Sequence, residues 1–295
     1  MTLFNPKRIL CPVDFSETSA SALRAAALVA RPFDAEVMVL HAQSFETPLY
    51  FTAAQTRTLE TQLRKSAKAA RAYLHEYAAR QLPMDTRWTS VLAEGDPVTV
   101  ILREIQNSKI DLVAMGTHGR TGLSRVRLGS VMESVLRQAE IPVLTAGPRM
   151  HSAAVPGTLK RILYLVDLKD TVRPGLAHAT SLAEKTGAEI VLLHVAPAGA
   201  GHAAPLGDIR QQLCDWVPPE VRRRCSVQES VRSGDPGSES VAYIEESRPD
   251  LVVVDARPRN VLSSILFGST TEAVIRNSPR PVLSVISRVR DQGGA

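Results

Sequence analysis

The stretch KRILCPVD at residues 7–14 returns as KRILYLVD at residues 160–167, at an offset of 153 (160 − 7). A second apolar segment, AEVMVLHA at 35–42, returns at the same offset as AEIVLLHV at 188–195. Both segments have the length and the β-branched and aliphatic content of buried strands. A repeat at this distance predicts that one domain architecture occurs twice in the chain.

The later parts of the two copies keep a second constant offset. EGDP at 94–97 matches SGDP at 233–236, and IPVL at 141–144 matches RPVL at 280–283, both at an offset of 139 (233 − 94). Two constant offsets on either side of one jump indicate a tandem duplication with a single net deletion. The deletion falls between the second strand and EGDP in first-copy numbering.

Between the copies lies GPRMHSAAVPGT at 147–158, which is rich in Pro, Gly and small residues and lacks hydrophobic periodicity. We expect a first domain at 1–148, a linker at 149–158 and a second domain at 159–295. A chain of 295 residues is long enough for two domains of ordinary size.

Within the first copy, strand-like segments alternate with helix-like segments. The expected strands are 8–13, 36–42, 86–92, 111–116 and 142–147, and the expected helices are 17–30, 53–80, 96–106 and 130–138. Ser16 and Asp96 are suitable caps for two of these helices, and Pro97 suits a first helical position. The segment 86–92 alternates in polarity, as expected near a sheet edge. Such alternation of elements predicts an α/β fold with a parallel sheet covered on both faces.

The loop GTHGRTGLSRVRLGS at 116–130 joins the expected fourth strand to the last helix. Glycine lets the backbone approach a ligand closely, and the amino end of a helix offers unpaired N–H groups and a positive dipole end. Gly116, Gly119, Gly129 and Ser130 therefore suit a phosphate cradle at the carboxyl ends of the strands. Asp14 ends the first strand on the same edge and suits a ribose hydroxyl. A loop with glycines only for turning is the alternative.

Other chemistries lack their motifs in this sequence. There is no GxxxxGK[ST], no GxGxxG after the first strand, and no GxSxG, HExxH or paired CxxC. We therefore expect no catalytic residue and no protein-held metal. His41 and His194 occupy equal positions in the two copies, and we expect each to make a structural hydrogen bond at a strand end.

Composition limits the partners. A net charge of +5 and a pI near 9.3 permit an anionic ligand, but aromatics at 4% are few for stacking on bases, which argues against nucleic acid. No apolar run is long enough to span a membrane. Cys11, Cys214 and Cys225 form neither a disulfide framework nor a metal set, which favours the cytoplasm. Cys11 lies in an apolar run and is expected to be buried.

The pattern G-x2-G-x9-G-[ST], together with PVDFSETS at 12–19 and a second strand ending in LHA, resembles the universal stress protein family, and within it the tandem-domain members. The resemblance implies two Rossmann-like domains, each a five-stranded parallel sheet of order 3-2-1-4-5 with helices on both faces. It also implies ATP as a cofactor in one branch of the family, with Mg²⁺ left open.

Carried over residue by residue, the resemblance places the base near Pro12, Val13 and Ala42 and the sugar near Asp14, Met115 and Gly116. The phosphates fall near Gly119, Gly129, Ser130 and Val131, and Arg120 in the same loop suits an anion. Family members pair their fifth strands, so 142–146 and 281–285 are expected to pair within this chain as a pseudo-dimer. A further homodimer and any protein partner stay open.

The second copy departs from the pattern. Asp255 stands where the first copy has Gly116, and Pro258 stands where it has Gly119, while Gly268 and Ser269 remain. Proline removes an N–H donor and aspartate adds a negative charge. We therefore expect nucleotide to bind mainly in the first domain, and the second domain to bind weakly.

The expected function is that of a cytoplasmic ATP-binding regulatory protein of the stress response. A slow ATPase is one alternative, although the absence of a P-loop lysine argues against efficient hydrolysis. A non-nucleotide interaction scaffold is the second. A flavin- or adenylate-using relative is a remote third.

Overall fold

The computed structural model describes residues 4–43, 53–119, 128–150, 157–169, 173–197, 206–256 and 268–286, with only the backbone of 53–65 and of Leu206. The first half contains β1 (Arg8–Pro12), α1 (Glu17–Ala30), η1 (Arg31–Phe33), β2 (Glu36–Gln43), α2 (Ala53–Gln81), β3 (Trp88–Glu94), α3 (Pro97–Asn107), β4 (Leu112–Gly116), α4 (Ser130–Gln138), β5 (Val143–Ala146) and η2 (Pro148–Met150). The second half contains β6 (Arg161–Leu165), α5 (Pro174–Thr186), β7 (Glu189–Ala196), α6 (Leu206–Trp216), α7 (Pro219–Arg224), β8 (Val227–Ser233), α8 (Pro236–Ser247), β9 (Leu251–Ala256), α9 (Ser269–Asn277) and β10 (Val282–Ile286).

The strands form one continuous sheet with the order β3-β2-β1-β4-β5-β10-β9-β6-β7-β8. Within each half all pairings are parallel, and the order along each half reads 3-2-1-4-5. The predicted α/β fold with two tandem domains is confirmed. β3 lies at one outer edge of the sheet, as its alternating polarity predicted.

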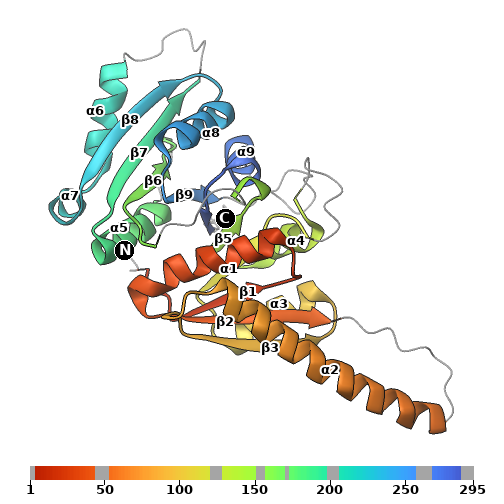
Figure 1. Cartoon of the computed structure of the whole chain (residues 1–295). Helices are drawn as coiled ribbons and strands as arrows, with labels where there is room; N and C mark the ends of the chain where they lie inside the picture. The colour runs from red at the N-terminus through yellow and green to blue at the C-terminus, as the bar shows by residue number, and fades with distance from the viewer. Residues whose placement is uncertain are drawn as a thin grey trace, which may run out of the picture.

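The halves meet through their fifth strands. β5 and β10 pair antiparallel, with Leu144 opposite Leu283 and Thr145 opposite Val282. The two strands lie together at the centre of Figure 1, where the colour changes from yellow-green to blue. The predicted intrachain pairing of 142–146 with 281–285 is therefore present.

A second contact between the halves involves the start of the chain. The Phe4 ring lies 4.5 Å from the His178 ring and 5.5 Å from the Phe33 ring, and the Phe4 N–H donates to Ser181 Oγ at 3.2 Å. Burial lowers the pKa of His178 below its ordinary value, because a charged imidazole would be poorly solvated there.

Helices cover both faces of the sheet because each strand sends successive side chains to opposite sides. Ile9 and Cys11 of β1 belong to the apolar layer that also contains residues of α1, α2, α5 and α6, whereas Leu10 belongs to the layer on the other face, with residues of α3, α4, α8 and α9. Figure 1 shows α1 in front of the first-half strands and α2 extending well beyond the sheet. No helix of the described residues is long and apolar enough to cross a membrane.

The helix starts follow the predicted capping residues. The Ser16 side chain accepts from the Ser19 N–H, and the Asp96 side chain accepts from the Thr99 N–H, with Pro97 at the first position of α3. α4 begins at Ser130, with Gly129 in an extended conformation before it.

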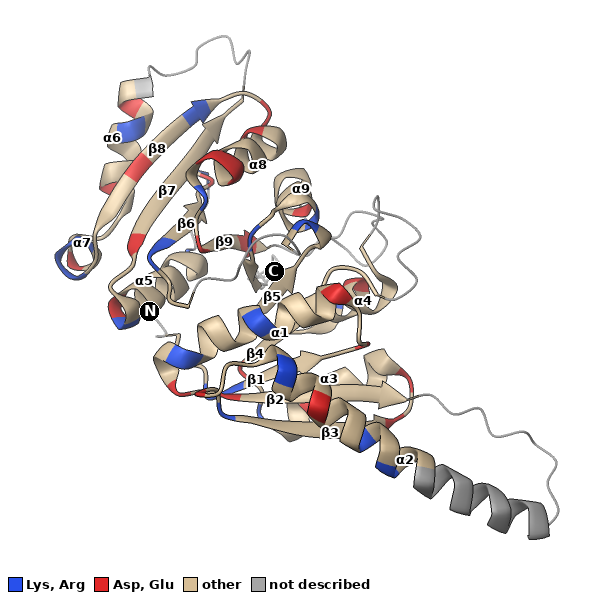
Figure 2. Ribbon diagram, viewed as in Figure 1, with Lys and Arg blue, Asp and Glu red and all other residues tan. Residues whose placement is uncertain are grey.

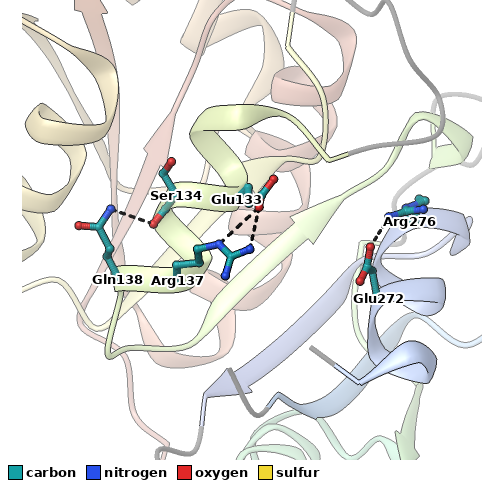
Figure 3. Close-up of polar contacts among 6 residues, drawn as sticks. All are labelled: Glu133, Ser134, Arg137, Gln138, Glu272 and Arg276. Carbon is teal, nitrogen blue, oxygen red and sulfur yellow. Dashed lines mark hydrogen bonds and ion pairs between the residues drawn. The ribbon is translucent and has the colours of Figure 1, made fainter. Parts of the chain in front are cut away.

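Positions of Lys and Arg and of Asp and Glu are interspersed along the described helices and strands (Figure 2). Equivalent i,i+4 pairs recur on α4 and α9, where Glu133 pairs with Arg137 and Glu272 pairs with Arg276 (Figure 3). These pairs are related by an offset of 139 (272 − 133), which is also the offset of the later repeat segments. The duplication therefore extends to side-chain contacts on the helix surface.

Candidate functional site

A cavity of about 280 Å³ opens at the carboxyl ends of the first-half strands. Ten of the residues predicted from the sequence line it: Pro12, Val13, Asp14, Ala42, Met115, Gly116, Gly119, Gly129, Ser130 and Val131. The eleventh, Arg120, lies outside the described residues, as do Arg125 and Arg127. The structure thus brings together segments that are far apart in the chain (Figure 1).

Further lining residues were not predicted: Ser19, Leu40, His41, Pro97, Ile101, His118 and Met132. Ile101 and Met132 are each only 2% exposed and form an apolar wall from α3 and α4. The sequence could have indicated these two residues only through their position, about one turn after the helix caps Asp96 and Gly129. A helix entering the site amino end first places such residues beside the ligand.

Gly119 lies beside the side chain of Asp14. A Cβ at position 119 would come within 2.8 Å of Asp14 Oδ2, closer than carbon and oxygen can approach. Gly119 thus lets the loop after β4 approach the carboxylate at the end of β1.

Gly116 is glycine for a different reason. A Cβ there would lie 2.7–2.9 Å from Thr18, including the backbone carbonyl carbon of that residue. The end of β4 therefore packs directly on the first turn of α1. The Thr18 hydroxyl also donates to the carbonyl of His118, which fixes the glycine loop to that helix.

The β1–α1 turn holds the Asp14 side chain in place. Its Oδ1 accepts from the Ser16 N–H at 3.1 Å and from the Ser16 hydroxyl at 2.6 Å. Phe15 between them adopts a left-handed backbone conformation with φ of 64°. This conformation is uncommon for a residue with a side chain, and it sits at the site.

The amino end of α4 closes the cavity opposite the strands. The Gly129 N–H donates to the Thr117 carbonyl at 2.8 Å, and the helix then starts at Ser130. The first amides of a helix have no partner within it and carry the positive end of its dipole. Because Gly129, Ser130 and Val131 all line the cavity, this end of the helix is suited to an anion.

His41, His194 and Cys11 have structural roles. His41 Nδ1 lies 2.7 Å from the Val13 carbonyl, and His194 Nδ1 lies 2.9 Å from the Val166 carbonyl, which confirms the strand-end role predicted for both. Cys11 is buried, as predicted, and burial raises the pKa of its thiol. All three cysteines are free.

Tyr77 borders the site from α2. Burial raises the pKa of its hydroxyl to about 12, and Ser19 Oγ lies 3.2 Å away. The tyrosine therefore stays neutral at physiological pH. Within the described ranges, no group of three or more His, Cys, Asp or Glu side chains is arranged to hold a metal ion.

A second cavity, of about 460 Å³, occupies the same place in the second half. Its lining includes Asp167, His194 and Gly268, which are equivalent to Asp14, His41 and Gly129. Pro258 lies outside the described residues.

The sequence predicted that the Asp255 carboxylate faces the ligand phosphates, but in the structure it makes two hydrogen bonds to neighbouring protein groups. It accepts from the buried Tyr164 hydroxyl and, at 2.7 Å, from the Gly175 N–H at the start of α5. α5 begins only at Pro174, although α1 begins at a position equivalent to residue 170 (17 + 153). The hydrogen bond from Gly175 therefore holds the Asp255 side chain at the start of α5. Asp255 also lines the second cavity, so repulsion of an anionic ligand by its charge stays a prediction.

The fold and the first cavity define a class: tandem Rossmann-like α/β domains with a cavity at the strand ends, bordered by glycines and the amino end of a helix. The Universal stress protein family matches residues 5–146 and 158–285. The chain belongs to this family, with one domain of it in each half.

Individual proteins similar to this chain belong to the same family. The universal stress protein MJ0531 of Methanocaldococcus jannaschii is 32% identical over 142 residues, covering 47% of this chain and 80% of the relative. A universal stress protein of Mycolicibacterium smegmatis is 27% identical and covers 95% of this chain and 97% of its own. A crystal structure of a universal stress protein from Archaeoglobus fulgidus matches with a TM-score of 0.65 at 24% identity, over 94% of this chain and 97% of that one, which supports the fold.

Proposed function

We propose that the first domain binds an adenine nucleotide, ATP, and that the chain is a regulatory protein of the stress response. One observation carries the proposal. Ten residues, predicted from the sequence without coordinates, line a single cavity that has an apolar part, a carboxylate and a helix amino end. Those three features match a base, a ribose and a phosphate chain.

In the proposed complex the base lies against Pro12, Val13 and Ala42, with Ile101 and Met132 as the apolar wall. The Asp14 carboxylate accepts a hydrogen bond from a ribose hydroxyl. The phosphates lie between the glycine loop and the amino end of α4, and any Mg²⁺ is bound through them.

We propose binding and signalling rather than catalysis as the main role. The domains are 1–148 and 159–295, joined by 149–158, and the second takes no ATP of comparable affinity. Three free cysteines suit the reducing cytoplasm, where we propose that the protein acts.

The test is to purify the full chain untagged, denature it, and quantify the released nucleotide by chromatography and mass spectrometry. Titration of the nucleotide-free protein with ATP, ADP, AMP and cAMP then identifies the preferred ligand, and ADP formation measures any hydrolysis. One adenine nucleotide per chain is expected. Two would show that the second cavity accepts ATP as well, and none at millimolar ATP would overturn the proposal in favour of an interaction scaffold.

A further inference from the structure

The two cavities differ most on the wall that their last two helices supply. The first wall consists of Ile101, Val131 and Met132, and the second consists of Ser240, Thr270 and Thr271. The offset of 139 relates the members of each pair (240 − 101), so the positions are equivalent. Three apolar side chains on the first wall are thus replaced by three hydroxyl-bearing side chains on the second. Random substitution in a pocket without a ligand would not favour hydroxyls at all three positions.

Ser240 is the most informative of these residues. It is 2% exposed, it lines the second cavity, and its hydroxyl has no hydrogen-bond partner in the described part of the chain. Because Ser240 lines the cavity, its hydroxyl is available to hydrogen-bond a polar group of a ligand there. At the equivalent place in the first cavity, Ile101 needs no partner.

The opposite side of the second cavity is suited to one negative charge. α9 starts at Ser269 after Gly268, and no side chain among the described residues caps its amino end. Lys169 also lines the cavity and forms no ion pair with the described residues. Asp167 lies between this end and the strands, where its carboxylate can accept from ligand hydroxyls.

We propose that the second cavity binds a small saccharide that carries one phosphate group. The hydroxyls of Ser240, Thr270 and Thr271 both donate and accept, as sugar hydroxyls require. The floor of Leu165, Val166 and Leu193 suits the apolar C–H face of a sugar ring. The phosphate lies at the amino end of α9 beside Lys169. The cavity volume falls within the range of small-molecule sites.

Calorimetric titration of the full chain with glucose 6-phosphate, maltose, glucose and inorganic phosphate tests this. Glucose 6-phosphate is expected to bind at least about tenfold more tightly than glucose or inorganic phosphate, because only it uses both ends of the cavity. Saturating ATP should leave this binding unchanged.

The variant Ser240→Ile/Thr271→Met gives the second wall the residues of the first. It should weaken glucose 6-phosphate binding at least about tenfold and leave ATP binding in the first domain unchanged. Asn277→Met is the matched control, since it adds the same thioether to α9 at an exposed position outside this cavity and at the far end of the helix. Ser240→Ala, which only removes the hydroxyl, replaces the double variant if that one does not fold.

The proposal is overturned if no sugar compound binds at about 10 mM, if inorganic phosphate binds as tightly as the sugar phosphate, or if the double variant binds like the wild type. Competition between ATP and glucose 6-phosphate for one site would also overturn it. The ATP titration on the same samples separately reports whether the first cavity works.

Discussion

The two halves differ in how the end of the fourth strand packs against the first helix of the domain. In the first half Thr18 in the first turn of α1 lies against β4, and only glycine fits at position 116. In the second half α5 begins later, and Asp255 fills the space and binds the amide of Gly175. The start of the helix and the identity of the residue at the end of the fourth strand therefore differ together between the halves.

A charge placed in the loop after β4 should produce the largest difference in ligand binding between the two halves. Gly119→Asp puts a carboxylate beside Asp14 and the proposed phosphates, and the Kd for ATP should rise about 100-fold or more. Gly268→Asp is the matched control in the second half, where an added Cβ meets nothing within 4 Å. Gly119→Asn separates crowding from charge and should lose less affinity. Equal losses in Gly119→Asp and Gly268→Asp would refute a binding role confined to the first domain.

Gly116→Ala should have the largest effect on folding. The added methyl would lie 2.7–2.9 Å from Thr18, partly against backbone, so α1 or β4 must shift. We expect a loss of about 2 kcal/mol in the free energy of unfolding, measured with denaturant. An unchanged unfolding midpoint would mean that the first turn of α1 moves away easily.

Asp255→Ala is the reciprocal change in the second half. It leaves the hydroxyl of Tyr164, a residue with no exposed surface, without the carboxylate that accepts from it, and leaves α5 without its cap. Stability should fall by about 1.5 kcal/mol while ATP binding stays unchanged. A double-mutant cycle with Tyr164→Phe isolates the hydrogen bond. A gain of ATP binding in Asp255→Ala would show that the charge of Asp255 weakens the second site.

The smallest effect is expected from Arg149→Ala, which removes a contact between the linker region and the second half. Arg149 lies 2.5 Å from Glu245 and donates to the Asn277 carbonyl, but the two charged side chains are 50% and 44% exposed. Exposed pairs contribute little, so the loss should stay below about 1 kcal/mol and shrink with added salt. Glu245→Gln is the control. A loss well beyond that range in thermal unfolding would show that this contact holds the halves together.

Much of this could be predicted from the sequence because it is periodic. The constant offsets, the caps at Ser16 and Asp96 and the pairing of the fifth strands all depend on local patterns or on exact repetition. The segments that meet at the first cavity also followed, since the carboxyl ends of parallel strands share one edge of the sheet.

The direction of Asp255 could not be predicted in this way. It depends on where α5 begins, and that start has no strong capping signal in the sequence. The apolar wall of Ile101 and Met132 was missed for a related reason: its residues look like ordinary core positions until the helices are placed around the cavity. Both are consequences of tertiary packing rather than of local propensity.

The ladder between β5 and β10 has one more consequence. In a dimer of separate chains the two binding sites are copies of one sequence, and every mutation changes both at once. Here the partner strand is tethered, at an effective concentration that dilution of the protein cannot lower. The assembly is therefore permanent, and each site is encoded by its own residues. Such a molecule can keep one ligand in one half while the other half acquires a different one.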